Sequence, residues 1–224
     1  MAQIVNMEKA SNMIQNGMTV MIGGFIGCGA PNQLLEKICA NNPKELTLIA
    51  NDTGILGDAM SQLIVNKCAS KLIATHIGTN KETGRQMSAG ELVVKLVPQG
   101  TLAEQIRAAG AGLGGVLTPT GIGTIVEEGK QKIVINGEEY LIELPVHANI
   151  ALLNAYKADK DGNLVYRRSA RNFNPLMAMS ADIVIAQVDY ILEVGEIDPD
   201  EVVTPGIFVD YLVQKQPQEV CING

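Results

Sequence analysis

The sequence predicts an α/β protein with an open, mainly parallel sheet, helices on both of its faces, and a small antiparallel hairpin region. Two observations predict this fold. Short apolar segments alternate with helical patterns of about ten residues, which is the arrangement of βαβ units. The segment at residues 19–22 is a short, apolar run rich in β-branched residues, as expected for a strand buried on both faces. With 224 residues, of which 46% are hydrophobic, the chain can form a single domain over residues 1–224.

The first half of the chain supplies the repeated strand–helix pattern. Strands are expected at residues 19–22, 46–50, 71–75 and 92–97. Helices are expected at residues 7–16, 31–39, 60–65 and 102–109. Asn6 and Gly17 are a candidate N-cap and a candidate stop for the first helix. Thr101 and Glu104 have the spacing of a capping box for the last one.

The pattern changes after residue 109. Residues 110–123 contain six glycines and are predicted to form no regular element. Asn136-Gly137 predicts a hairpin of residues 132–135 and 138–144. Asp161-Gly162-Asn163 predicts a second turn, between residues 150–156 and 164–166. The remaining expected elements are a helix at 175–181, a strand at 183–188 and an extended segment at 202–213 with a turn at Pro205-Gly206.

Composition and charge exclude several classes of protein. The net charge is −7 and the chain has no basic run, which argues against binding to nucleic acid. No apolar segment approaches the roughly 18 residues of a membrane helix, and the first ten residues do not resemble a signal peptide. Cys28, Cys39, Cys68 and Cys221 have neither disulfide-motif nor metal-ligand spacing. We therefore expect a cytoplasmic protein with reduced thiols, without a metal and away from membranes.

The most informative segment is GGFIGCGAP at residues 23–31, with four glycines within seven residues. It directly follows an apolar strand and precedes a helical pattern for which Pro31 suits the first turn. A glycine turn in that position directs free N–H groups toward one point, where anions bind. A tight strand-to-helix turn without a ligand is the alternative. The position beyond the carboxyl end of a strand favours binding.

Two nucleotide-binding motifs share features with this segment. No Gly-Lys-Ser/Thr follows the glycines, which excludes a P-loop. A dinucleotide fingerprint fits better, because Asp52 closes the next strand where a ribose-binding acid would stand. However, residues 27–32 lack the third glycine, and Pro31 occupies the position meant for close helix packing. The dinucleotide interpretation is therefore disfavoured.

Other polar residues offer weaker candidates. His76 and His147, the only histidines, stand beside no nucleophile motif and are interpreted as surface or structural residues. The acidic residues form no clear pair for acid–base catalysis. Residues 110–123 would be a mobile lid or, as we favour, a connecting loop.

A polar cluster precedes the expected helix at 175–181. It comprises Arg167, Arg168, Arg171, Asn172 and Asn174. The cluster could bind a phosphate or an acidic partner, although a salt-bridged surface is the expected outcome.

Asn16-Gly17, the strand at 19–22 and GGFIGCGAP together resemble the signature of the alpha subunit of family I coenzyme A transferases. That signature is Asp/Asn-Gly, an apolar strand, Gly-Gly-Phe, three free positions, Gly, one free position and Pro. Further matching blocks are LTLIANDTG (46–54), HIGTN (76–80), VPQGTLAEQIRAAGAGLGG (97–115), LTPTGIGT (117–124), EEGK (127–130) and SARNFNP (169–175). The whole chain resembles subunits acting on acetate, butyrate and acetoacetate. It is also similar to the amino-terminal half of fused succinyl-CoA:3-ketoacid enzymes.

The resemblance implies ping-pong transfer of coenzyme A between two carboxylic acids through a glutamyl-CoA intermediate. It implies no ATP, metal or organic cofactor, with coenzyme A as a substrate. In the family the nucleophile lies in a Ser-Glu-Asn-Gly motif, and this chain contains no Glu-Asn pair. The resemblance therefore implies no catalytic glutamate in this chain. It also implies activity only with a beta subunit, in an A2B2 or larger hetero-oligomer.

By resemblance, the coenzyme A-binding segment comprises Gly23, Gly24, Phe25, Ile26, Gly27, Cys28 and Gly29. Its amides could also stabilise charge that develops during acyl transfer. Strand topology adds Asn51 and Gln99, which follow neighbouring strands and are expected to face the same crevice and orient the substrate.

Three alternatives to the transferase remain open. The resemblance extends to the fold of sugar-phosphate isomerases and of effector-binding domains of transcription regulators. An isomerase should bring an acid–base pair and a regulator a DNA-binding head, and neither is apparent in the sequence. A structural subunit would keep turnover unchanged when the loop is altered.

Overall fold

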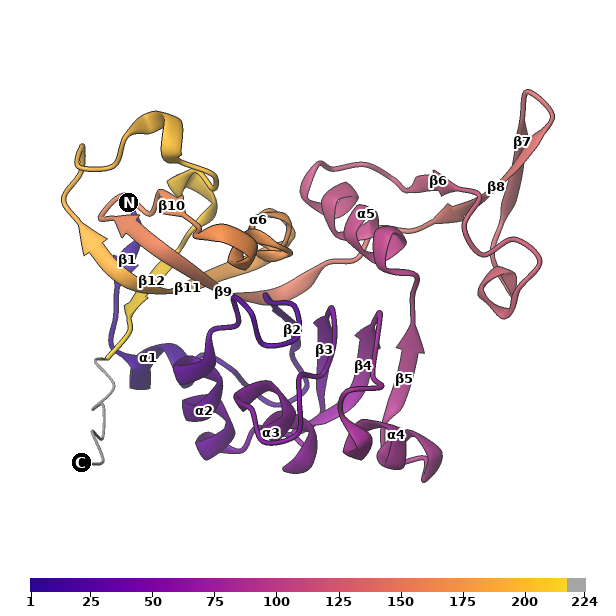
Figure 1. The fold of residues 1–224 in the computed structure, drawn as a ribbon, viewed down its shortest axis with the longest axis horizontal. Coiled ribbons are helices and arrows are strands. Elements are labelled where there is room, and N and C mark those ends of the chain that lie inside the picture. Colours follow the sequence, from indigo (N-terminus) through magenta and orange to yellow (C-terminus); the bar gives the residue numbers. More distant parts are fainter. Residues whose placement is uncertain (217–224) are drawn as a thin grey trace.

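The computed structural model describes residues 1–216, and its centre is a nine-stranded sheet (Figure 1). Its strands are β1 (Gln3–Ile4), β2 (Thr19–Ile22), β3 (Leu46–Ala50), β4 (Ala69–Ala74), β5 (Val93–Leu96), β9 (Ala148–Asp159), β10 (Leu164–Val165), β11 (Ala181–Leu192) and β12 (Tyr211–Gln214). The order is β1-β12-β11-β9-β2-β3-β4-β5, and neighbours along this path are parallel. Only β10, which pairs with β9, is antiparallel. The predicted fold class is confirmed.

Helices cover both faces of this sheet. They are α1 (Met7–Ser11), α2 (Asn32–Asn41), α3 (Ala59–Val65), α4 (Lys81–Ser88), α5 (Gln99–Gly110) and α6 (Asn174–Met177). Val20 and Ile22 of β2 belong to the core with α1, α2 and α3, whereas Met21 belongs to the core with α5 and α6. Successive side chains of a strand point to opposite faces, so both faces of β2 are buried. This double burial is why β2 is a continuous apolar run rather than an alternating one.

A separate antiparallel sheet projects beyond α5 (Figure 1). It has the order β6-β8-β7 and comprises β6 (Val116–Thr118), β7 (Lys132–Ile135) and β8 (Glu138–Glu143). We call residues 116–143 the lobe. Asn136 and Gly137 both have positive φ, +53° and +85°, as a type I′ hairpin turn requires. In β8, Glu143 accepts a hydrogen bond from Gln105 of α5 (3.0 Å), which ties the lobe to the body, and it forms an ion pair with Lys130 within the lobe. The predicted hairpin is confirmed.

Several predicted boundaries were wrong. Helix α5 begins at Gln99, not at residue 102, so Thr101 lies inside the helix and is buried, and no capping box forms. Pro98 takes the N-cap position instead, without a side-chain hydrogen bond. Residues 110–123 do contain a strand, β6, which pairs with β8 from the hairpin. Of the expected segment 202–213, only residues 211–213 lie in a strand, β12 (Tyr211–Gln214), and a 3₁₀ turn covers Gly206–Phe208.

Two further differences from the predicted elements concern helices α1 and α4. Asn6 caps α1 as predicted, accepting from the Lys9 amide at 2.7 Å, but the helix ends at Ser11 rather than residue 16. Helix α4 was not predicted, because its sequence KETGRQMS lacks an apolar stripe. It begins at the Asn80 cap, whose amide also donates to the carbonyl of Thr53 (3.1 Å). A long-range contact therefore places this helix.

Two further expectations from the sequence concern the cysteines and membrane-spanning helices. Cys28, Cys39 and Cys68 carry free thiols, and Cys221 lies outside the described residues. Among residues 1–216, no helix has both the length and the apolar character needed to cross a bilayer.

Helix α2 receives its N-terminal hydrogen bond from a distant strand. Its N-cap residue, Pro31, offers no side-chain acceptor. Instead the side-chain oxygen of Gln187, on β11, accepts from the Leu34 amide at 2.9 Å, and its nitrogen donates to Asn154 (3.2 Å). Gln187 and Leu34 are fully buried. Because four N–H groups at a helix start lack partners within the helix, this contact replaces a local cap.

We expect Gln187→Leu to lower the free energy of unfolding by about 1–3 kcal/mol, because it leaves the Leu34 amide buried without an acceptor. Urea denaturation of this chain would measure the change. Amide hydrogen exchange at Leu34 should also become faster by more than that at Ile38, which lies later in the same helix. An increase no larger at Leu34 than at Ile38 would contradict a capping role for Gln187.

Candidate functional site

The glycine segment forms a tight turn beyond the carboxyl end of β2. Phe25 and Cys28 exchange both backbone hydrogen bonds, each at 3.0 Å. Between them, Ile26 and Gly27 have φ values of +46° and +77°, which defines a type I′ turn. A β-branched residue rarely adopts positive φ, and holding one there costs on the order of 1–3 kcal/mol. Other contacts must therefore stabilise the turn.

Asp52, which follows β3, holds the turn from one side. One carboxylate oxygen accepts from the Ile26 amide at 2.7 Å and from the Asn51 side chain at 2.7 Å. The other accepts from the Gly54 amide at 2.7 Å. Asp52 is only 5% exposed. Hydrogen bonds to a charged acceptor are stronger than neutral ones, at about 1.5–3 kcal/mol, so the contact can offset the strain at Ile26.

Two asparagines from the last third of the chain hold the base of the turn. Asn174 donates to the Gly29 carbonyl (3.0 Å) and accepts from the Asn154 amide (3.1 Å), and Asn172 donates to the Cys28 carbonyl (2.9 Å). Asn174 lies directly against Gly23, where a Cβ would be 1.9 Å from its side-chain oxygen. Glycine at position 23 is therefore required by close packing, whereas φ requires it at position 27.

Most amides of the segment are already used within the protein. The Gly23 amide donates to Leu152 (2.9 Å), that of Ile26 donates to Asp52, and those of Phe25 and Cys28 donate to each other's carbonyls. Within residues 1–216, the amides of Gly24, Gly27 and Gly29 have no acceptor. Gly24 is buried, while Gly27 and Gly29 are half-buried. Of the seven residues predicted from the sequence, these three supply the N–H groups that a bound anion can use.

The two predicted substrate-orienting residues lie in direct contact. The Gln99 side chain, at the start of α5, donates to the Asn51 oxygen at 3.0 Å, and Thr75 donates to the same oxygen at 3.0 Å. Asn51 is 2% exposed and Gln99 is exposed. Asp52 connects Asn51 to Ile26, so one hydrogen-bonded network runs from Gln99 to the glycine turn.

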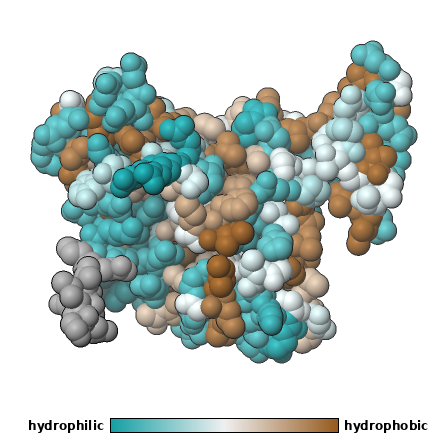
Figure 2. Space-filling model, in the orientation of Figure 1, coloured by the Kyte–Doolittle hydropathy of each residue, from teal (hydrophilic) through white to brown (hydrophobic). Residues whose placement is uncertain are grey.

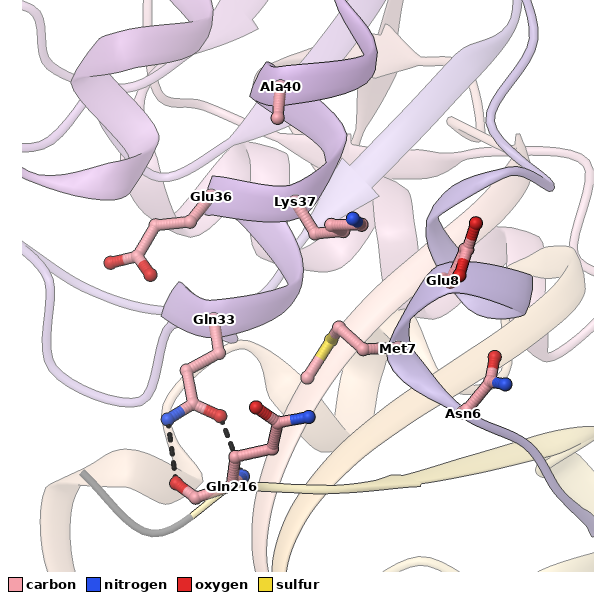
Figure 3. A pocket seen from close by; sticks show the side chains of 8 residues that line it. All are labelled: Asn6, Met7, Glu8, Gln33, Glu36, Lys37, Ala40 and Gln216. Carbon is pink, nitrogen blue, oxygen red and sulfur yellow. Dashed lines mark hydrogen bonds between the residues drawn. The ribbon is translucent and has the colours of Figure 1, made fainter. Parts of the chain in front are cut away.

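The spaces around the turn differ in size. Beneath it, a cavity of about 10 Å³ is bounded by Gly24, Gly27 and Asn51, which is about the volume of one water molecule. Beside Gln99, a groove of about 600 Å³ runs between α5 and β6. Figure 3 shows a hollow of about 690 Å³ between α1 and α2, whose lining residues include none of the glycine segment. Gln33 and Gln216 are hydrogen-bonded at its edge (2.9 Å).

The remaining candidates from the sequence play other parts. His147 and His76 are both exposed, and His147 lies 3.8 Å from Asp182. The expected salt-bridged surface at Arg167, Arg168 and Arg171 was wrong, because none of the three forms an ion pair among residues 1–216. Arg167 instead lies over the ring of Tyr156, 5.3 Å from its centroid.

The 3₁₀ turn η2 (Arg168–Arg171) packs on the glycine turn. Ser169 contacts the thiol of Cys28 at 3.3 Å, and a Cβ on Gly29 would lie 2.8 Å from the Ala170 carbonyl. Asn172 and Asn174, which the sequence groups with these arginines as a polar cluster that could bind a phosphate or an acidic partner, bind the protein's own loop with their side chains. Within the described part of the chain, no group of three or more His, Cys, Asp and Glu residues is placed to hold a metal ion.

Comparisons with known proteins show the family of the chain. The family described as Coenzyme A transferase matches residues 4–215. The chain is 50% identical over 214 residues to the acetate CoA-transferase subunit alpha of Escherichia coli K12, covering 96% of this chain and 97% of that protein. It is 44% identical to the acetoacetyl-CoA:acetate/butyrate CoA transferase alpha subunit of Clostridium acetobutylicum, covering 96% and 98%.

Solved structures show the same fold. A thioester complex of an acyl-CoA transferase from Escherichia coli O157:H7 with CoA matches with a TM-score of 0.87 at 20% identity, over 97% of this chain. This chain spans 48% of that one, about half its length. Glutaconate coenzyme A-transferase from Acidaminococcus fermentans matches with a TM-score of 0.84 at 18% identity, covering 95% of this chain and 75% of that one. The chain belongs to the coenzyme A transferase family.

The packing at Gly23 gives a stability prediction. We expect Gly23→Ala to lower the free energy of unfolding by about 1–3 kcal/mol, because the new methyl group overlaps Asn174, which its hydrogen bonds hold in place. Gly84→Ala in α4 is the control, since a Cβ there meets open space, and alanine should stabilise the helix by about 1 kcal/mol. Urea denaturation would measure both. A neutral Gly23→Ala would show that Asn174 can move away.

Proposed function

We propose that this chain is the alpha subunit of a CoA-transferase that moves coenzyme A between a short-chain acyl-CoA or acetoacetyl-CoA and a free short-chain acid. Acetate, butyrate and acetoacetate are the proposed acids. The observation that carries the proposal is the glycine turn with its unpartnered amides of Gly24, Gly27 and Gly29, connected through Asp52 to Asn51 and Gln99. The names of the two similar alpha subunits support the substrate class.

The proposed reaction divides the chemistry between two chains. A glutamate carboxylate of the partner attacks the thioester carbonyl. The C–S bond breaks, CoA departs as the thiolate, and an acyl-glutamyl anhydride forms. The thiolate then attacks the glutamyl carbonyl and expels the carboxylate product, which leaves a glutamyl-CoA thioester. The incoming acid reverses these steps. Coenzyme A is the substrate, and the proposed route uses no cofactor.

This chain would bind coenzyme A and stabilise charge. Each acyl transfer builds negative charge on a carbonyl oxygen, and fixed amide donors stabilise such charge without reorganising. The half-buried amides of Gly27 and Gly29 suit that role, and Gly23 to Gly29 would form the contact surface for coenzyme A. Asn51 and Gln99 would orient the substrate carbonyl or carboxylate together: Gln99 is exposed at this sheet edge, and the buried Asn51 amide holds its side chain.

Exposed apolar side chains support an assembly with a beta subunit. Around the glycine turn, Phe25, Ile26, Ile55 and Leu56 are each at least 40% exposed. Figure 2 shows hydrophobic residues along the projecting lobe, where Leu117, Ile125, Ile133 and Val134 are exposed. Grouped apolar residues on a surface mark interaction sites. We propose an A2B2 or larger hetero-oligomer located in the cytoplasm.

The missing nucleophile can be tested by reconstitution. We expect this chain alone to transfer no coenzyme A from acetoacetyl-CoA to acetate, and the mixture with its beta chain to do so. Formation of acetyl-CoA, followed by chromatography, would be the readout, and the beta chain alone is the control. Turnover by the isolated alpha chain would contradict the proposed division of roles. An inactive mixture that nevertheless assembles would contradict the proposed function.

A further inference from the structure

Asp52 is a buried carboxylate that the proposed reaction does not use. It accepts three hydrogen bonds, each at 2.7 Å, from the amides of Ile26 and Gly54 and from the Asn51 side chain. All three donors are neutral, and within residues 1–216 Asp52 forms no ion pair. A charge that is 5% exposed and lacks a cation is costly unless donors satisfy it. Three donors satisfy this charge, so Asp52 can hold its surroundings in one arrangement.

The first consequence of this arrangement is the shape of the glycine turn. Ile26 is held at φ +46°, although a β-branched side chain disfavours that region. The Asp52 hydrogen bond acts on the amide of this same residue. Gly27, whose unpartnered amide is the next along the chain, takes its direction from the turn. Asp52 thus fixes an amide that it does not contact.

The second consequence is the orientation of the Asn51 amide. Because its nitrogen donates to the carboxylate, its oxygen faces Gln99 and Thr75 and accepts from both. A flipped amide would place an oxygen against the carboxylate and a nitrogen against two donors. The charge of Asp52 therefore selects one of two orientations of the Asn51 amide, and this orientation holds the Gln99 side chain by its hydrogen bond to the Asn51 oxygen.

We propose that Asp52 is a positioning residue for acyl transfer: it fixes the direction of the Gly27 amide and, through the buried Asn51 amide, the position of the exposed Gln99 side chain. This rests on the proposed function. A carboxylate that only caps a loop would accept the same kind of hydrogen bonds, but weakening those bonds would leave turnover unchanged. Asp58 provides that comparison, because it accepts from the amides of Ile55 (2.8 Å) and Ser61 (2.7 Å) at the start of α3.

The test compares Asp52→Asn with Asp58→Asn in the reconstituted enzyme. The amide introduced by Asp52→Asn would direct an NH₂ group at a donor, so we expect kcat to fall at least tenfold with a smaller change in KM. We expect amide hydrogen exchange over residues 24–28 to become at least tenfold faster. Asp58→Asn should keep kcat within twofold and leave exchange over residues 24–28 unchanged, while lowering the urea midpoint.

A second variant separates positioning from loss of folding. Glycine adopts positive φ without strain, so Ile26→Gly should make the turn depend less on Asp52. We expect the drop in kcat caused by Asp52→Asn to be at least threefold smaller in the Ile26→Gly background. Equal drops in both backgrounds, or equal effects of Asp52→Asn and Asp58→Asn on kcat, would overturn the proposal.

The exchange measurement needs no turnover, so it distinguishes the two hypotheses. If the wild-type assembly transfers no coenzyme A, the proposed function fails and with it the positioning of substrate. Unchanged exchange over residues 24–28 in Asp52→Asn, with transfer intact in the wild type, would overturn the role of Asp52 alone.

Discussion

The burial of both faces of the parallel sheet is the constraint on which the rest of the structure depends. Helices pack on each face of β2, so Val20, Met21 and Ile22 are all inaccessible to solvent. Polar chemistry can then occur only where strands end. The parallel direction brings the ends of β2 and β3 to one edge. The glycine turn, Asn51 and Asp52 lie together for that reason.

At this edge the chain must hold a strained turn in a fixed shape. Asp52 binds the turn from β3, and Asn172 and Asn174 bind its base from the last third of the chain. Gln187, also from the last third, caps the helix that follows the turn. Four buried or half-buried polar side chains therefore direct their hydrogen bonds to the loop and the helix after it. The result is a small set of amides, from Gly24, Gly27 and Gly29, that remain without partners among the described residues.

The parts that the sequence predicted are those with local signals. The apolar runs located β2 and β3 to the residue, and Asn136-Gly137 located the hairpin of the lobe. The glycines of residues 23–29 located the candidate site. The parts that were missed depend on contacts distant in sequence. Asp52 was considered only as a ribose ligand, because nothing local indicates that it binds Ile26, 26 residues away. The start of α5 was misplaced because Thr101 and Glu104 have the spacing of a capping box although both lie inside the helix.

We propose that the turn at Gly27 presents the amides used in acyl transfer, and substitution of Gly27 tests this. Gly27→Val and Gly90→Val place the same strain at similar φ, +77° and +71°, where neither Cβ meets a neighbour closer than 3.8 Å. Gly90 lies between α4 and β5, outside the candidate site. With the two subunits still assembled, we predict that Gly27→Val abolishes transfer from acetoacetyl-CoA to acetate, whereas Gly90→Val keeps kcat within twofold. Full activity in Gly27→Val would show that the glycine segment is only a turn.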